Sequence, residues 1–234
     1  MTPSRPRIGI LKCGHVAESI ETAHGTYTEW FRDFLGPQGF DMPVWAVIDG
    51  EFPESADACD GWLVTGSPLG AYEDHAFIPR LEAFLREIRA AQKPLVGICF
   101  GHQIIAQAFG GKVVKHPGGI KIGRQSYEVE GLGPLALNAW HGDQVVELPE
   151  GARVIATGED VPVGAMRIGD RVLTLQTHPE MTNACLLGLV DLRRDAGIFA
   201  PGQVAEAEAA AAEPVDSARA AEWIGDFYRQ ALAG

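Results

Sequence analysis

The sequence predicts an α/β fold of three layers, in which a mostly parallel central sheet carries helices on both faces. The main observation is that short apolar segments, typical of buried parallel strands, alternate with amphipathic helical segments and glycine-containing turns. A second observation is a late pair of alternating segments around a turn, which predicts a β-hairpin. The 234 residues suffice for one such domain, and a hydrophobic content of 46% suits a globular chain.

The first part of the chain predicts two strands with a helix between them. Arg7 to Leu11 (RIGIL) is a short apolar run that ends near Cys13 and Gly14, as a buried strand entering a loop does. Residues 28–35 place large apolar side chains on one face, which indicates an amphipathic helix. Pro43 to Ile48 (PVWAVI) predicts the second strand.

The next part repeats this alternation twice. Gly61 to Thr65 (GWLVT) predicts a strand that ends at Gly66-Ser67-Pro68, and residues 78–91 carry a helical stripe of Leu, Phe and Ile. Pro94 to Ile98 (PLVGI) predicts a strand, followed at once by a helix over residues 100–109. Alternation of this kind favours parallel strands joined by helical crossovers.

The pattern changes after residue 111. Residues 112–146 contain shorter β-like pieces with many glycines. Val163 to Ile168 and Arg171 to Gln176 alternate around Gly169-Asp170, which predicts a hairpin with a two-residue turn. This hairpin would deliver His178.

The last part of the chain is expected to be largely helical. We predict helices over about 182–194 and over 216–232, the second with apolar side chains at helical spacing. Residues 201–214 are rich in Ala and Glu, a composition that suits either a solvated helix or a loosely held excursion, and the sequence leaves both open.

Charge and apolar content limit the partners and the location. A net charge of −12 without a local Lys/Arg cluster repels a phosphate backbone, so no nucleic acid partner is expected. No run of about 20 apolar residues predicts a membrane span, and residues 1–14 contain only a short apolar run, so no signal peptide is expected. We expect a cytoplasmic protein with a single domain over 1–234, comprising a core at about 7–190 and a helical extension at about 191–234.

The cysteines and histidines do not predict a metal site. Four cysteines, Cys13, Cys59, Cys99 and Cys185, are scattered without C-x-x-C pairs, which argues against a disulfide framework and a thiolate zinc site. The histidines have no metal-like spacing with carboxylates or thiols. We therefore expect no metal and no cofactor, and each cysteine is considered as an individual thiol.

Cys99 has the sequence environment of a nucleophile. It lies between a predicted strand and a predicted helix, where the helix N-terminus lowers the pKa of a thiol. Gly97 and Gly101 flank it, as small residues flank the strained nucleophile elbow of hydrolases. His178 could act as its base, and Glu180 could orient the imidazole because residues i and i+2 of an extended segment face the same way.

Two motifs carry a resemblance to a known family. The run GICFGHQ, Gly97 to Gln103, together with QTHPE, Gln176 to Glu180, resembles the G-x-C-x-G-x-Q elbow and the late Q-x-H-P-E segment of the class I glutamine amidotransferases. The resemblance covers about residues 7–190 and implies a flavodoxin-like fold with the catalytic His carried by the hairpin. Within the family, the chain is most similar to the amidotransferase half of GMP synthase and to stand-alone relatives that hydrolyse γ-glutamyl compounds.

The resemblance implies roles for five residues in catalysis. Cys99 would be the nucleophile that forms a γ-glutamyl thioester, while His178 and Glu180 would be the base and its orienting acid. The backbone N–H groups of Gly66 and Phe100 would bind the tetrahedral oxyanion.

It also implies a substrate pocket. Gln103 would contact the amino-acid end of the substrate, and Trp140-His141-Gly142-Asp143 resembles a loop, often S-H-G-D, that lines the same pocket. The expected substrate-binding residues are Ser67, Gln103, Trp140, His141, Gly142 and Asp143.

Three hypotheses of function remain open. The first is an enzyme that cleaves glutamine or another γ-glutamyl compound, either alone or as a subunit that supplies ammonia to a separate synthetase. No S-G-G-x-D-S phosphate loop is present, so GMP synthesis by this chain alone is not expected. The second is a non-catalytic regulatory module of the same fold, and the third is another cysteine chemistry on that fold. The oligomeric state is also open, a homodimer included.

Overall fold

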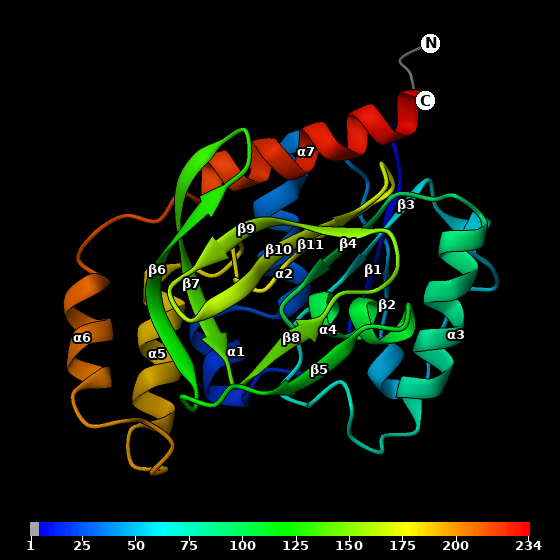
Figure 1. Cartoon of the computed structure of the whole chain (residues 1–234). Helices are drawn as coiled ribbons and strands as arrows, with labels where there is room; N and C mark the ends of the chain where they lie inside the picture. Colours follow the sequence, from blue (N-terminus) through cyan, green and yellow to red (C-terminus); the bar gives the residue numbers. More distant parts are fainter. Residues whose placement is uncertain (1–4) are drawn as a thin grey trace.

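A nine-stranded sheet forms the centre of the molecule in this computed structural model, which describes residues 5–234 (Figure 1). The prediction about the N-terminal stretch includes residues 1–4, which lie outside the described residues. A separate two-stranded sheet pairs β5 with β8. In spatial order the strands of the large sheet are β2 (Val44–Trp45), β1 (Ile8–Leu11), β3 (Gly61–Val64), β4 (Leu95–Ile98), β11 (Val172–Leu175), β10 (Val161–Ile168), β9 (Ala152–Gly158), β6 (Lys121–Val129) and β7 (Gly133–His141), and those of the small sheet are β5 (Lys112–Lys115) and β8 (Asp143–Glu147).

The large sheet has a parallel half and an antiparallel half. The strands β2, β1, β3, β4 and β11 run parallel to one another, whereas the pairs β11–β10, β10–β9, β9–β6 and β6–β7 are antiparallel. The register places Leu175 of β11 beside Ile98 of β4, so these two strands end at the same edge of the sheet. The predicted α/β class with a central sheet and helices is confirmed.

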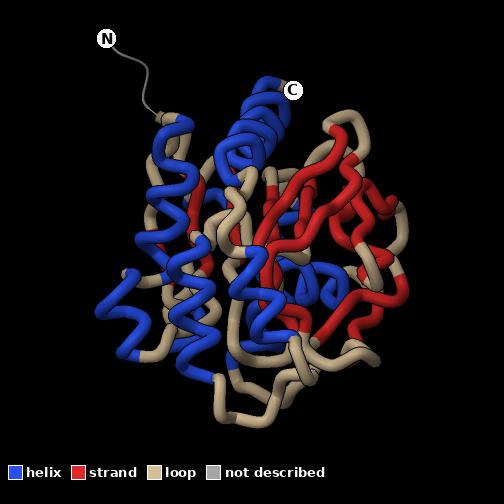
Figure 2. Tube along the Cα trace, turned by 90° about the vertical axis from the view of Figure 1, so that its left-hand side faces the viewer, coloured by secondary structure: helices blue, strands red, loops and turns tan. Residues whose placement is uncertain are grey.

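Helices form the outer layers, and Figure 2 shows them beside the strands. They are α1 (Glu18–His24), α2 (Tyr27–Leu35), α3 (Phe77–Ala90), α4 (Phe100–Ala108), α5 (Asn183–Arg193), α6 (Gln203–Ala210) and α7 (Ser217–Ala233), with short 3-10 turns η1 (Gly36–Gln38), η2 (Val47–Asp49) and η3 (Ala56–Ala58). None of the helices between Arg5 and Gly234 combines the length and the apolar character that a membrane span requires.

Two core clusters cover the two faces of the parallel half. Alternate side chains of a strand point to opposite faces, so Trp62 and Val64 pack with α3 and α4, while Leu63 packs with α2 and α7. Strands buried on both faces explain the continuous apolar runs in the sequence. Helix α7 belongs to this core, because Tyr228 is fully buried and its hydroxyl donates to the Trp62 carbonyl oxygen at 2.8 Å.

Two predicted elements differ in detail. The second strand extends only over Val44–Trp45, because β1 offers it two partner residues before the chain turns into η2. The predicted two-residue hairpin turn is a three-residue loop, since Ile168 pairs with Val172, and Gly169 adopts a left-handed φ of 53° there.

Local sequence signals predict the helices unequally well. Helix α2 begins after Thr26, whose side chain accepts from the Glu29 N–H while Glu29 accepts from the Thr26 N–H, a capping box. Helix α1 was not predicted, because its seven residues bury only Ile20 and give no clear stripe. Residues 201–214, for which the sequence left a helix and a loosely held excursion open, contain the helix α6 (orange in Figure 1), which packs against β6.

Candidate active site

Cys99 lies at a sharp turn between β4 and α4. Its backbone has φ 53° and ψ −103°, a conformation that L-residues rarely adopt and that costs on the order of 1–3 kcal/mol. The flanking glycines are required by space, since a Cβ on Gly101 would lie 2.3 Å from the Val64 carbonyl oxygen and one on Gly97 would lie 2.5 Å from the Gly101 carbonyl oxygen. The predicted tight turn is therefore present, with Cys99 at the N-terminus of α4, and its role as a nucleophile stays a prediction.

The segment after β11 brings His178 to this turn. The Cys99 N–H donates to the Leu175 carbonyl oxygen at 2.8 Å, which ties the end of β4 to the end of β11. The His178 N–H donates to the Asn138 carbonyl oxygen at 2.8 Å, in an isolated bridge to β7. These two hydrogen bonds fix the backbone that carries Cys99 and His178, and the motifs predicted neither of them.

His178 and Glu180 form a buried pair. The distance from His178 Nδ1 to Glu180 Oε1 is 2.7 Å, and the exposed fractions of the two side chains are 4% and 0%. Burial by itself lowers the pKa of His178, but the neighbouring charges of Cys99 and Glu180, with hydrogen bonds to both side chains, outweigh it and raise the pKa well above its usual value. Since Glu180 occupies Nδ1, Nε2 is the nitrogen left for the hydrogen bond with Cys99.

Two linked glutamines lie near Cys99, one of them next to the sulfur. Gln176 Nε2 is 3.8 Å from Cys99 Sγ, and Gln103 Nε2 donates both to Gln176 Oε1 at 3.2 Å and to the Asp143 carbonyl oxygen at 3.1 Å. Gln103 is only 3% exposed, and its hydrogen bond to Gln176 connects it to the sulfur. Its contact with substrate stays a prediction. Gln176 is the first residue of the Q-T-H-P-E motif, but the sequence indicates no role for it, because its partner Gln103 comes from a helix far away in the sequence.

The loop predicted to form the oxyanion site lies against the imidazole. A Cβ on Gly66 would be 2.9 Å from His178 Cε1, so the backbone of this loop contacts the ring. Thr65 fixes the loop by donating its hydroxyl to the Gly66 carbonyl oxygen at 2.9 Å and accepting from the Cys13 N–H at 3.0 Å. Phe100 begins α4, so its N–H has no partner within the helix. Ser67 Oγ accepts from the Leu69 N–H at 3.2 Å and so holds the loop.

The predicted substrate loop, residues 140–143, also lies at the site. The Trp140 carbonyl oxygen is 3.7 Å from Cys99 Sγ, and the Gly142 carbonyl oxygen accepts from the His116 N–H at 2.8 Å. His141 Nδ1 donates to the Asp143 carbonyl oxygen at 2.9 Å, which leaves Nε2 as a buried acceptor without a partner among the described residues. Burial lowers the pKa of His141 to about 4, so this ring is neutral.

Asp143 closes the loop at its far end. Its Oδ1 accepts from the Tyr72 hydroxyl at 2.8 Å, and burial raises the pKa of the carboxyl. All of the residues predicted from the sequence therefore come to one edge of the sheet, at the ends of β3, β4, β7 and β11.

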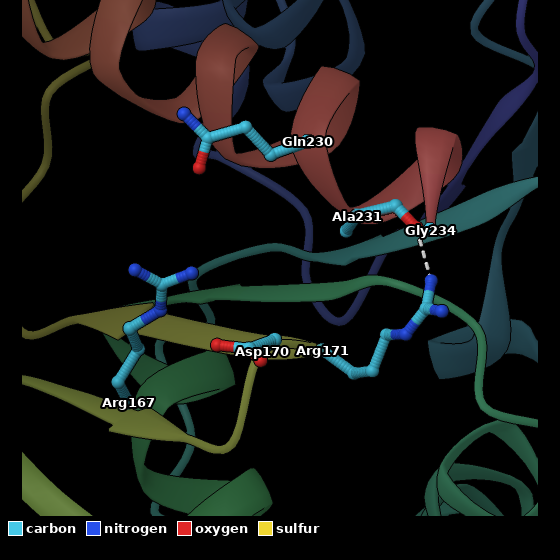
Figure 3. A pocket seen from close by; sticks show the side chains of 6 residues that line it. All are labelled: Arg167, Asp170, Arg171, Gln230, Ala231 and Gly234. Carbon is cyan, nitrogen blue, oxygen red and sulfur yellow. Dashed lines mark hydrogen bonds between the residues drawn. The ribbon is translucent and has the colours of Figure 1, made fainter.

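A cavity of about 380 Å³ lies elsewhere and takes no part in this arrangement. It sits between the turn of the β10–β11 hairpin and the end of α7, where Arg171 donates to the Ala231 carbonyl oxygen (Figure 3). Across residues 5–234, His, Cys, Asp and Glu side chains do not gather in groups of three or more that could hold a metal ion.

Comparisons with known proteins agree with the motifs. The profile of the family "Glutamine amidotransferase class-I" matches residues 23–184. Gamma-glutamyl peptidase 3 of Arabidopsis thaliana is 33% identical over 191 residues, which are 75% of this chain and 77% of that protein. A GMP synthase [glutamine-hydrolyzing] of Thermotoga maritima is 35% identical over 130 residues, 52% of this chain but 24% of that protein.

Solved structures show the same fold. A glutamine amidotransferase from Thermotoga maritima superposes with a TM-score of 0.74 at 20% identity and covers 98% of this chain and 99% of its own. One from Methylobacillus flagellatus gives a TM-score of 0.73, also at 20% identity. The matched residues include Cys99, residues 140–143 and the His-Pro-Glu segment, and the predicted resemblance is confirmed: the chain belongs to the class I glutamine amidotransferase family.

Proposed function

We propose that this protein hydrolyses a γ-glutamyl amide through a γ-glutamyl thioester on Cys99. The observation that carries the proposal is the contact of a strained cysteine turn with a buried His178–Glu180 pair. A cysteine that only fills the core needs neither a strained backbone nor a paired imidazole. At Cys99 both features would prepare the sulfur for nucleophilic attack.

The first half-reaction forms the acyl-enzyme. The Cys99 thiolate attacks the γ-carbonyl carbon, a C–S bond forms, and the carbonyl oxygen becomes an oxyanion that the N–H groups of Gly66 and Phe100 bind. As the C–N bond breaks, the leaving amine takes the proton from Nε2 of the His178 imidazolium. Glu180 holds Nδ1 and favours the charged ring, which agrees with the raised pKa of His178.

The second half-reaction releases glutamate. The now neutral Nε2 of His178 takes a proton from a water molecule as the water attacks the thioester carbonyl. The tetrahedral intermediate expels the Cys99 thiolate, and the imidazolium is restored. Atoms balance with one water consumed per amide, and no cofactor is needed.

The relatives favour action by the chain alone. Gamma-glutamyl peptidases of Arabidopsis thaliana match it over about three quarters of both lengths, whereas a GMP synthase matches over a quarter of its own. The second candidate is a subunit that supplies ammonia to a separate synthetase, and the GMP synthase match is the observation that favours it. A cytoplasmic location and a homodimer stay predictions.

Purified protein tests the proposal with a substrate panel. Glutamine and γ-glutamyl dipeptides are incubated with the wild-type chain and with Cys99→Ser, and glutamate is measured by mass spectrometry. Release from a substrate of this panel by the wild type alone supports it. Negligible turnover of the whole panel, together with selective labelling of Cys99 by a diazo-ketone analogue of glutamine, would indicate the ammonia-supplying subunit. Absence of both turnover and labelling would indicate a non-catalytic module.

A further inference from the structure

The segment between β1 and α2 forms one wall of the site. A Cβ on Gly14 would lie 2.7 Å from Pro68 Cδ, so the chain after β1 packs on the loop that carries Gly66. At the far end of the segment, Tyr27 begins α2, and its Cε1 would lie 3.8 Å from a Cβ on Gly66. His178 Cε1 would lie 2.9 Å from the same Cβ. The tyrosine ring and the imidazole therefore border one glycine of the predicted oxyanion loop.

Tyr27 is held in place by apolar contacts. Its ring meets Trp30 edge to face with centroids 5.1 Å apart, and it packs with Val16 and Trp140 against a cluster that includes Met181. No described residue forms a hydrogen bond with its hydroxyl in the structure. Burial, together with the nearby charges of Cys99 and Glu180, raises the pKa of Tyr27 far above its usual value, so the phenol stays neutral and can donate.

Tyr27 borders the same glycine as the imidazole that would protonate the leaving amine. The His178 ring atoms nearest to a Cβ on Gly66 are Cε1 at 2.9 Å and Nδ1 at 3.7 Å, and Nε2, the proton donor of the proposed reaction, is bonded to Cε1. An amine that extends from Nε2 over Cε1 would therefore meet the Tyr27 ring. An apolar, half-buried wall with one hydroxyl would not help to bind ammonia. It would help to bind an organic amine with an apolar or aromatic body.

We propose that Tyr27 forms the subsite for the leaving amine and sets the preference of this enzyme for γ-glutamyl compounds larger than glutamine. This inference rests on the proposed hydrolysis. The ring would pack on the body of the amine, and the hydroxyl would donate to an acceptor such as the next carbonyl of a γ-glutamyl peptide.

The kinetic test compares leaving groups. Tyr27→Ala, Tyr27→Phe and the matched control Thr28→Ala, on the next residue of α2, are assayed with γ-glutamyl-p-nitroanilide, γ-glutamylglycine and glutamine. We expect Tyr27→Ala to lower the ratio of kcat/KM for the anilide to that for glutamine by about tenfold, mainly through KM. Tyr27→Phe keeps the ring, so it should retain the anilide ratio and lower that of γ-glutamylglycine by about threefold. Equal losses on all three substrates would show that Tyr27 only supports the fold, and would overturn the inference.

A binding test separates this inference from the proposed function. Calorimetry on Cys99→Ala, and on the same protein with Tyr27→Ala added, measures the affinity for uncleaved γ-glutamyl-p-nitroanilide and for glutamine. A selective loss of affinity for the anilide supports the subsite, and unchanged or equally reduced affinities overturn it. Absence of turnover in the wild type would instead reject the hydrolysis, whatever the binding result.

Discussion

The ends of β1 and β4 are each followed by a buried cysteine, yet only Cys99 lies beside an imidazole. Cys13 follows β1, donates its thiol to the Leu11 carbonyl oxygen at 3.4 Å, and has no imidazole among its hydrogen-bond partners in the structure. Burial raises the pKa of Cys13 far above its usual value, which keeps the thiol protonated. Cys99 follows β4 with a strained backbone at a helix N-terminus and with His178 beside it. Burial alone thus keeps a thiol protonated. The difference at Cys99 is the imidazole of His178, which the end of β11 brings to it.

The largest expected effect is the loss of activity when the Cys99 sulfur is removed. Cys99→Ala should lower kcat by a factor on the order of 10⁶, because no other group can form the acyl-enzyme. Cys13→Ala is the matched control and should retain activity. Glutamate release is measured for both variants. A strong loss of activity in Cys13→Ala with an intact fold would contradict the difference between the two cysteines.

The next effect concerns the partner of His178. Glu180→Gln keeps the shape but removes the charge that favours the imidazolium, so kcat should fall by a factor on the order of 10⁴. Circular dichroism verifies that the variant is folded. Activity near the wild-type level would mean that Glu180 does not orient the imidazole.

The elbow itself can be tested by stability. Gly101→Ala places a Cβ 2.3 Å from a backbone oxygen, and we expect the free energy of unfolding to fall by about 2–3 kcal/mol. Gly36→Ala is the matched control, since nothing lies within 4 Å of its Cβ and its φ of −55° suits alanine. Urea unfolding of both variants should show a loss in the first and almost none in the second. Equal stabilities would mean that the turn at Cys99 is not tightly packed.

The smallest effect is a dependence of stability on pH. The pKa of His178 is raised in the folded state, so its contribution to stability is fully present below the unfolded pKa of about 6.5 and is lost as pH rises through the folded pKa. The difference in unfolding free energy between the wild type and His178→Gln should therefore shift against the wild type as pH rises above about 6.5. A difference that stays constant from pH 6 to 10 would contradict the raised pKa.

Local patterns were sufficient for much of the fold and part of the site. The apolar run before Cys99 and the glycines on both sides predicted a strand, a tight turn and a helix, because these features depend on neighbouring residues only. The hairpin was predicted for the same reason, although its turn is one residue longer. Helix α1 was missed since its seven residues bury only one apolar side chain, and Tyr27 was missed because its proximity to Gly66 arises from packing.

The sequence by itself determined which residues could react: a cysteine at a turn that only small neighbours allow, and a histidine two residues before a glutamate. The tertiary structure alone decided that they meet. Parallel pairing of β4 with β11 brings Ile98 beside Leu175, and the hydrogen bond to Asn138 then fixes the backbone of His178, whose side chain is a neighbour of Cys99. The physical reason is that strand register and side-chain packing depend on contacts between distant segments, and no short stretch of sequence encodes such contacts.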